Sequence, residues 1–306
     1  MYYGKYNRKE IIMNILEYEN YEEKKAHGEE AFPYITYPCT IPLDFPSVPT
    51  HWHNEYEIIY IKKGQGVRSV DLEYHDVSSG DIVLIVPGQL HSIEQKFNET
   101  MEYENIIFGA DILMSRHNDY CYTNFFSSLT KRTLQLPTIF NSSTCSYYQE
   151  IASCIDNADE ICKTFPYGYQ LAIKSYLFQM FFTIFTHLPK GNVPTKKKKS
   201  LDKMKLIVKY VENNYADNIT IEDMAKLCDF SQSHFMKFFK NNMEVSFIEY
   251  LNNYRLTMAS RLLISSSSSI IAIAMESGFD NLSYFNRLFK KKYEMTPSEF
   301  RRQYQA

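Results

Sequence analysis

The amino-acid sequence predicts an α+β protein with an N-terminal β-barrel, a helical appendage to that barrel and an all-α C-terminal domain. Three observations lead to this fold class. Short apolar runs with glycine and proline punctuation fill residues 32–110, and apolar residues recur at helical spacing within residues 146–188. The last hundred residues repeat a helical pattern at an interval of fifty. A chain of 306 residues is long enough for two domains of ordinary size.

The barrel is predicted from closely spaced strand-like segments. The apolar run at residues 58–61 is closed by residues 62–66, two lysines followed by Gly-Gln-Gly, which is a good hairpin signal. A second buried run follows at residues 82–87. Short strands at this spacing are typical of a sandwich or a small barrel.

Two helices are predicted after the barrel, over residues 147–163 and 167–188. The second has a wide apolar face that includes Leu171, Leu177 and Phe181. Packing onto the barrel explains part of this face, and a contact between two copies of the chain is an equally open explanation.

Residues 189–200 contain two prolines, a glycine and a run of four lysines, so they are predicted to be a linker. The linker separates an effector-binding and dimerisation domain, residues 1–188, from a C-terminal domain, residues 201–306. Residues 1–195 carry 15 basic and 24 acidic side chains, whereas residues 196–306 carry 18 basic and 12 acidic ones. A basic C-terminal part suits contact with phosphate.

The repeat in the C-terminal part involves both core and cap positions. Phe235, Phe239 and Lys240 recur fifty residues later as Phe285, Phe289 and Lys290. Two copies are too few to stack as a solenoid. The pattern fits two helix-turn-helix units, each offering one helix to a DNA major groove.

Cap signals divide this region into helices. The predicted helices cover residues 201–215, 221–227, 232–240, 247–264, 270–277 and 282–293, with a last one beginning at Pro297. Capping boxes are predicted at Thr220–Asp223, Ser246–Glu249 and Thr296–Glu299, N-caps at Ser231, Ser269 and Asp280 or Asn281, and a C-cap glycine at Gly278.

Helical spacing also predicts which side chains face outward. The residues expected to be buried are Phe235, Phe239, Tyr284, Phe285, Leu288 and Phe289. The residues expected to be exposed are Gln232, Ser233, Met236, Lys237 and Lys240 in the first unit and Leu282, Ser283, Asn286, Arg287 and Lys290 in the second.

Residues 203–304 closely resemble the AraC/XylS family of transcription regulators, above all in GFDNLSYFNRLFKKKYEMTPSEFR at residues 278–301. The resemblance implies two helix-turn-helix units that a long helix joins and that enter successive major grooves on one DNA face. By position, it assigns Ser233, Met236 and Lys237 to one groove and Ser283, Asn286 and Arg287 to the next. The chain departs from the family at Glu244 and Glu294, where glycine is usual, and at Ala272, where the family often has an acidic residue.

The outward residues differ in what they can recognise. Arg287 can form two hydrogen bonds to guanine, and Asn286 can do the same with adenine. Lys237, Lys240 and Lys290 can equally bind phosphate, which carries no sequence information. Met236 offers only apolar contact, for example to a thymine methyl group.

The N-terminal part carries a second pattern, His51-x-His53-x3-Glu57, followed by Gly80-Asp81 and then by Pro87-Gly88-x2-His91. It resembles the two cupin motifs and implies a cupin-like barrel. Three imidazoles and a carboxylate can bind a transition metal, line an effector pocket or satisfy one another as structural polar groups. We predict an effector site made of His51, His53, Glu57, Tyr60 and His91, with no metal and no other cofactor. A cupin metalloenzyme with an accessory DNA-binding domain is the alternative.

These patterns together predict a transcription regulator and not an enzyme. The expected partners are double-stranded DNA, a small-molecule effector such as a sugar, a second copy of the chain in a homodimer, and RNA polymerase if the protein is an activator. The sequence has no apolar run long enough to span a membrane and no recognisable signal peptide, so a cytoplasmic protein is expected.

Overall fold

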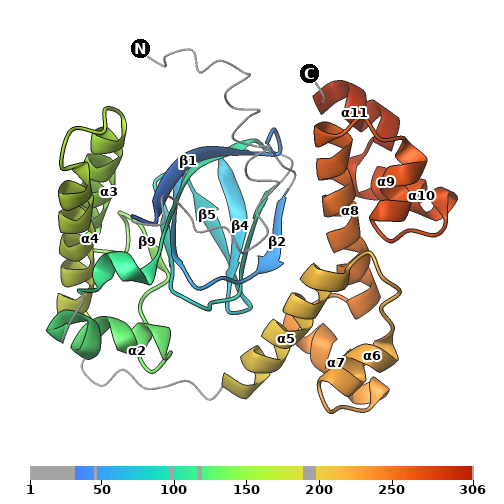
Figure 1. The fold of residues 1–306 in the computed structure, drawn as a ribbon, viewed down its shortest axis with the longest axis horizontal. Helices are drawn as coiled ribbons and strands as arrows, with labels where there is room; N and C mark the ends of the chain where they lie inside the picture. Colours follow the sequence, from blue (N-terminus) through green and yellow to red (C-terminus); the bar gives the residue numbers. More distant parts are fainter. Residues whose placement is uncertain (1–31, 45–46, 97–98, 116–118, 189–197, 305–306) are drawn as a thin grey trace. The chain divides into compact units, whose positions relative to one another are not determined.

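The computed structural model describes residues 32–44, 47–96, 99–115, 119–188 and 198–304. Within these residues the chain forms two compact units (Figure 1). The N-terminal unit is built around residues 52–188, and the C-terminal unit is built around residues 199–304 and includes residues 43–51. Among the described residues, no helix combines the length and the apolar character that crossing a bilayer requires.

Residues 34–140 form two β-sheets. Their strands are β1 (Tyr34–Ile41), β2 (Ser47–His51), β3 (Tyr56–Lys63), β4 (Gln65–Val70), β5 (Glu73–Ser78), β6 (Ile82–Ile85), β7 (His91–Gln95), β8 (Met101–Phe108) and β9 (Ile139–Phe140). One sheet has the order β1-β8-β3-β6-β9 and the other has the order β2-β7-β4-β5. Their inner faces meet, since the Glu57 carboxylate of β3 lies 2.9 Å from the His91 imidazole of β7. The predicted barrel is therefore confirmed.

Helical segments follow the barrel strands in the N-terminal unit. They are the 3₁₀ turn η1 (Ala110–Leu113), the π-helical turn η2 (Tyr122–Phe126) and the helices α2 (Ser127–Thr130), α3 (Tyr148–Cys162) and α4 (Tyr169–Thr186). The two predicted helices correspond to α3 and α4, whose ends lie within two residues of the predicted ones.

An apolar core joins the outer face of the five-stranded sheet to α3 and α4. The ring of Tyr56 stacks on Phe108 at a centroid distance of 5.2 Å and meets Phe181 of α4 edge-on at 5.4 Å. Helix α4 is also apolar on its other side, where Leu171 is 75% exposed and Phe182 is 62% exposed. Intramolecular packing therefore accounts for only one side of this helix.

The C-terminal unit is all α-helix. Its helices are α5 (Lys198–Asn214), α6 (Ile221–Leu227), α7 (Gln232–Met243), α8 (Phe247–Ser265), α9 (Ile270–Glu276), α10 (Leu282–Tyr293) and α11 (Pro297–Tyr304). The predicted fold class is confirmed, and two helix ends differ from the predicted ones by three residues. Helix α5 begins three residues before the predicted start, and α7 continues three residues past Lys240. The rest of the predicted linker, residues 189–197, lies outside the described residues.

Most of the predicted caps are present. Thr220 and Asp223 form a reciprocal capping box, and so do Thr296 and Glu299. At Ser246 only half of the predicted box forms, because its side chain accepts a hydrogen bond from the Glu249 amide at 3.2 Å without a return bond from the Glu249 carboxylate.

The turn after α9 requires glycine. Gly278 has a φ of 83°, which confirms the predicted C-cap glycine. A Cβ at this position would also lie only 2.8 Å from the carbonyl oxygen of Tyr215. The close approach of the backbone and the left-handed conformation both exclude larger residues here.

Candidate nucleic-acid interface and sensor site

Helix α7 separates buried from exposed side chains along its length. The Ser231 side chain starts the helix by accepting a hydrogen bond from the backbone amide of His234 at 3.3 Å. Phe235 and Phe239 are each 0% exposed and fix the helix in the core. The four side chains predicted to contact DNA are all exposed: Ser233, Met236, Lys237 and Lys240.

Helix α10 repeats this arrangement. The Asn281 side chain caps it by accepting a hydrogen bond from the Tyr284 amide at 2.9 Å. Phe285 and Phe289 are again 0% exposed. Of the predicted DNA-contacting residues, Ser283, Arg287 and Lys290 are exposed and Asn286 is half-buried.

Tyr284 is not buried as predicted, because its side chain is 37% exposed. Phe279 and Phe285, with ring centroids 5.2 Å apart, already fill the core at this end of α10. The Tyr284 hydroxyl instead accepts a hydrogen bond from Asn252 of α8 at 3.1 Å, and the Arg287 guanidinium carbon lies 5.3 Å from the Tyr284 ring centroid. This cation–π contact restricts the Arg287 side chain. The sequence repeat did not indicate it, because Asn252 belongs to another helix.

Helices α7 and α10 both end in a left-handed residue that is not glycine. Glu244 has a φ of 61° and Glu294 has a φ of 60°. The turn therefore keeps the shape that glycine favours, at a conformational cost of about 1 kcal/mol per residue.

The sensor motif residues meet inside the barrel. One ligand atom from each of His51, His53, Glu57 and His91 lies within 4.8 Å of all the others. The Glu57 Oε2 atom is the centre of the group, because it lies 2.8 Å from His53 Nε2 and 2.9 Å from His91 Nε2. We call these four residues the His/Glu cluster.

Burial and charge together set the protonation of this cluster. Burial alone would raise the pKa of Glu57, but the charge and hydrogen bonds of His91 and His53 hold it well below its usual range. Burial alone would lower the pKa of His53, but the hydrogen bond and charge of Glu57 raise it. The arrangement is an ionised carboxylate held between imidazoles.

The His/Glu cluster fits a divalent transition metal in donor type and in orientation. The Nδ1 atoms of His51 and His91 each lie 2.9 Å from a backbone carbonyl oxygen, those of Pro49 and Gln89. A carbonyl on Nδ1 fixes the tautomer that leaves Nε2 as a ligand, which is the usual support of metal-binding histidines. The same four side chains also suit hydrogen bonding to a polar organic ligand.

Tyr60, the fifth residue of the predicted effector site, does not join the cluster. It stands three residues after Glu57 in β3, and an odd spacing places two side chains on opposite faces of a strand. Its hydroxyl lies 3.4 Å from that of Tyr148, at the start of α3, and the Lys62 ammonium lies 3.5 Å from its ring centroid. Tyr60 thus belongs to the contact between the sheet and the helices.

Two polar residues on the inner faces of the sheets were missed by sequence reasoning. Arg68 of β4 is 2% exposed and Asn105 of β8 is 3% exposed. Gly66, Arg68 and Val70 share one face of β4 by the two-residue period of a strand, so the apolar Val70 could have indicated that Arg68 faces inward. Asn105 depends on pairing between distant strands, which no local pattern specifies.

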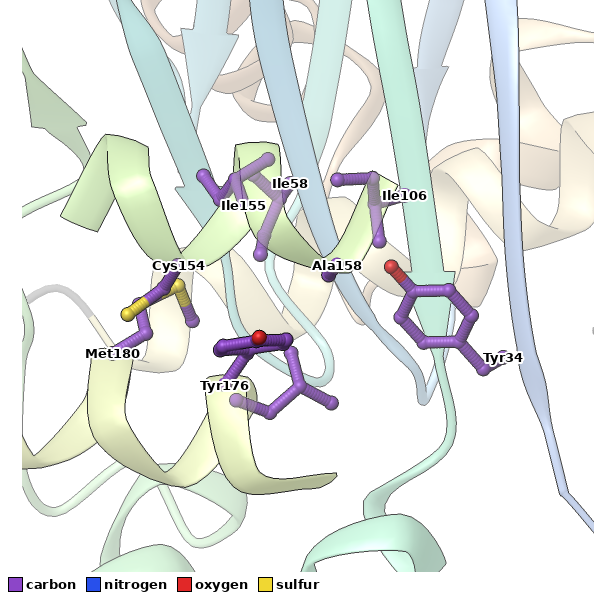
Figure 2. Close-up of a pocket in the computed structure, with 9 residues that line it drawn as sticks. Tyr34, Ile58, Ile106, Cys154, Ile155, Ala158, Tyr176 and Met180 are labelled. Carbon is purple, nitrogen blue, oxygen red and sulfur yellow. The ribbon is translucent and has the colours of Figure 1, made fainter. Parts of the chain in front are cut away.

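A small apolar pocket lies between the outer face of the five-stranded sheet and α3 and α4 (Figure 2). It is lined by Tyr34, Ile58, Ile106, Cys154, Ile155, Ala158, Tyr176, Leu177 and Met180. Its cavity volume of about 10 Å³ matches a single water molecule. An effector of metabolite size does not fit this pocket.

A duplicated helix-turn-helix with exposed basic faces, joined to a barrel with a polar interior, defines a DNA-binding transcription regulator with a ligand-binding domain. Comparison with known proteins agrees. Residues 224–303 match the helix-turn-helix domain family, and residues 43–155 match the AraC-like ligand binding domain. The chain belongs to the AraC/XylS family of transcription regulators.

Several relatives are similar along most of their length. An uncharacterised HTH-type transcriptional regulator of Bacillus subtilis, YdeC, is 23% identical over 93% of this chain and 97% of its own. The lactose operon transcription activator of Staphylococcus xylosus is 26% identical over 86% of this chain and 90% of its own. A solved structure of ToxT from Vibrio cholerae has a TM-score of 0.47 and 18% identity, covering 88% of this chain and 97% of that one.

Proposed function

We propose that α7 and α10 enter successive major grooves of double-stranded DNA. Ser233, Met236 and Lys237 would contact bases in one groove. Ser283, Asn286 and Arg287 would contact bases in the next. The observation that carries this proposal is the exposure of five of these six side chains on two capped helices whose opposite faces are buried phenylalanines.

The two faces differ in their capacity to read sequence. Arg287 can bind guanine with two hydrogen bonds, while Lys240 and Lys290, one helical turn further along, are placed to bind phosphate. We therefore expect a monomer to occupy two unlike, directly repeated half-sites about 10 bp apart. Symmetric half-sites within one monomer's footprint would contradict this expectation.

A gel-shift experiment with the full chain tests the proposal. Genomic fragments and randomised duplexes would be selected at physiological salt, and the selected site compared with a shuffled one of equal composition. We expect the selected site to bind about 10³-fold or more tightly than non-specific DNA. Binding that does not distinguish the two duplexes would rule out sequence-specific recognition.

We propose further that residues 1–188 bind a small-molecule effector inside the barrel and that residues 201–306 carry the DNA-binding function. The His/Glu cluster supports this assignment, because it offers hydrogen-bonding groups on the inner faces of both sheets. Among the relatives, one is named for a lactose operon, which supports a sugar-like effector. Tyr60 is better placed to transmit a change in the barrel to α3 than to touch the effector.

The effector regulates only if it binds the DNA-competent and DNA-incompetent states with different affinity. We propose that the protein acts in the cytoplasm, where its DNA partner is found, that it contacts RNA polymerase if it is an activator, and that it has no enzymatic activity.

A homodimer through the outer side of α4 is also proposed. Leu171 and Phe182 are exposed there, and Phe125 of η2, 41% exposed, lies beside Phe185 at 5.4 Å between ring centroids. Apolar patches of this kind are typical of protein contacts. Sedimentation of the Phe182→Asp variant tests the proposal: we expect monomers, and an unchanged mass would exclude this face as the interface.

A cupin-type metalloenzyme with an accessory DNA-binding domain is the second candidate, favoured by the fit of the His/Glu cluster to a metal. A metal bound there would supply Lewis-acid or redox chemistry, and His51, His53, Glu57 and His91 would hold it. Metal analysis of the purified protein and of His51→Ala separates the candidates. Stoichiometric metal that His51→Ala loses would support metal binding, and its absence would reject the enzyme.

A further inference from the structure

Among the described residues, the buried Arg68 of the barrel forms no ion pair. The Arg68 side chain is 2% exposed, and its Nε atom has no hydrogen-bond acceptor among the described residues. Burial lowers the pKa of Arg68, and the charge of Glu73 opposes this shift. A buried guanidinium without an anion is costly, so proteins rarely keep one unless it serves a ligand.

The strand register points Arg68 into the barrel. Val70 of β4 lies directly opposite His91 of β7, whose imidazole contacts Glu57 on the facing sheet. Arg68 precedes Val70 by two residues and is opposite Ile93. Residues two apart in a strand share a face, so Arg68 and His91 line the same interior.

The opposite wall offers a matching acceptor. Asn105 of β8 pairs with Ile59 of β3, two residues after Glu57, and therefore also faces inward. Its Nδ2 atom donates a hydrogen bond to the Tyr37 hydroxyl at 2.9 Å, and its buried Oδ1 atom has no hydrogen-bond donor within the part of the chain that the structure describes.

The two sheets contact each other at levels of the barrel on either side of Arg68 and Asn105. At one level Glu57 meets His91, and at another a Cβ on Gly66 of β4 would lie 2.5 Å from the Met101 sulfur of β8. Arg68 stands between Gly66 and Val70 on one wall, and Asn105 stands between Met101 and the Glu57 level on the other. The guanidinium and the amide oxygen are thus at neighbouring levels of one interior.

We propose that Arg68 binds the carboxylate of the effector and that Asn105 Oδ1 accepts a hydrogen bond from one of its hydroxyl groups. The effector is then a small hydroxy acid, such as a sugar acid. A guanidinium recognises a carboxylate through two parallel hydrogen bonds, and an unpaired amide oxygen discriminates in favour of a hydroxyl donor. This inference rests on the proposed effector function of the barrel and narrows the effector from a sugar to an acid.

Thermal unfolding of the full chain tests the ligand class. The probes are sodium glycerate, tartrate and gluconate at about 10 mM, with glucose as the neutral control and sodium chloride at equal ionic strength. We expect at least one acid to raise Tm by about 2 °C or more, and glucose and chloride to leave it unchanged. Equal shifts with glucose and gluconate, or no shift with any of the three acids, would overturn the proposal.

Three variants locate the effect. Arg68→Met should abolish the shift, Arg68→Lys should weaken it because the ammonium lacks the planar fork, and Lys63→Met, an exposed charge loss on β3, should retain it. Without ligand, Arg68→Met should unfold at the wild-type temperature or above it, since an unpaired buried charge is removed. A lower Tm for Arg68→Met would show that the arginine is structural and would also overturn the proposal.

Gel shifts on the same preparations separate this inference from the proposed function. Sequence-specific DNA binding with no acid-dependent shift would reject the hydroxy-acid site alone. Absence of sequence-specific DNA binding by the wild-type chain would reject the proposed regulator, whether or not the acids raise Tm.

Discussion

Asp159 of α3 forms a carboxyl pair with Glu104 of β8, which makes the N-terminal unit sensitive to pH. Burial, and then the hydrogen bond with Glu104, raise the pKa of Asp159 to about 9. Burial would also raise the pKa of Glu104, but the hydrogen bond from Asp159 and the charge of Lys62, whose ammonium is 3.0 Å away, lower it. The folded protein therefore keeps a proton on Asp159 at neutral pH, and the unfolded chain releases it.

The sign and the size of the effect follow from this difference. A group with a raised folded pKa contributes stability below its unfolded value of 3.8 and loses it as pH rises toward about 9. At about 1.4 kcal/mol per pKa unit, the stability that the protein loses between low pH and pH 7 through Asp159 is at most about 4 kcal/mol. The Asp159 side chain is 16% exposed and Lys62 lies 3.8 Å from it, so we expect about half of that maximum, about 2 kcal/mol.

Asp159→Asn removes this pH dependence while keeping a hydrogen-bond donor for Glu104. The variant should gain about 2 kcal/mol over the wild type at pH 7 and nothing at pH 4. Urea unfolding followed by the fluorescence of Trp52 isolates the N-terminal unit, because it is the one tryptophan in the sequence.

Asp156→Asn is the matched control. Asp156 also lies near Lys62, at 3.6 Å, but its side chain is 56% exposed, so its removal should change the free energy of unfolding by less than about 0.5 kcal/mol at every pH. Parallel pH profiles for the wild type and Asp159→Asn between pH 5 and 9 would refute the shared-proton account.

Three further predictions concern the C-terminal unit. Arg287→Ala should weaken the binding free energy by about 1–3 kcal/mol, and only at one base pair of the selected site. Lys290→Ala should weaken binding to all duplexes alike and lower the slope of log affinity against log salt concentration by about 1. Titration at several salt concentrations measures both effects. Phe289→Ala, which empties a fully buried position, should destabilise the unit by about 3–5 kcal/mol in urea unfolding followed by circular dichroism. Glu294→Gly should stabilise it by up to about 1 kcal/mol in the same assay, because φ is 60° there; a loss of stability would contradict this.

Local signals explain why the C-terminal domain could be predicted in detail. A cap such as Thr220 with Asp223 is decided by residues three apart, and a buried pair such as Phe235 and Phe239 by residues four apart. Tyr284 was misjudged because its exposure depends on space already taken by Phe279. The same limitation hid its bond to Asn252 on another helix.

In the barrel, more of the structure depends on contacts between residues distant in the sequence. Its strands and the His/Glu cluster were predicted, because the motif places the cluster residues within a few positions of strand ends. The predicted effector site also included Tyr60, but the two-residue period of a strand places the Tyr60 and Glu57 side chains on opposite faces of β3. Asn105 could not be found, since its orientation follows from pairing with β3, more than forty positions earlier in the chain. The roles of all these residues in effector or DNA binding stay predictions.

Helices α7 and α10 have the same buried phenylalanine pairs but differ in the contacts of their exposed side chains. In α10, the Tyr284 hydroxyl accepts a hydrogen bond from Asn252, and the Tyr284 ring makes a cation–π contact with Arg287. The equivalent position in the first unit is His234, whose ring instead lies on Phe230 at a centroid distance of 4.1 Å. A restricted guanidinium loses less conformational freedom on binding than an exposed lysine such as Lys237.

Sequence discrimination should therefore reside mainly in the half-site that α10 contacts. A double-mutant cycle tests this: Tyr284→Leu should reduce discrimination at the base pair that Arg287 reads, and should have no such effect once Arg287 is alanine. His234→Leu is the matched change in α7 and should leave that base pair unaffected. Independent, additive effects of Tyr284→Leu and Arg287→Ala would show that the tyrosine does not position the arginine, and both half-sites would then be read by equally mobile side chains.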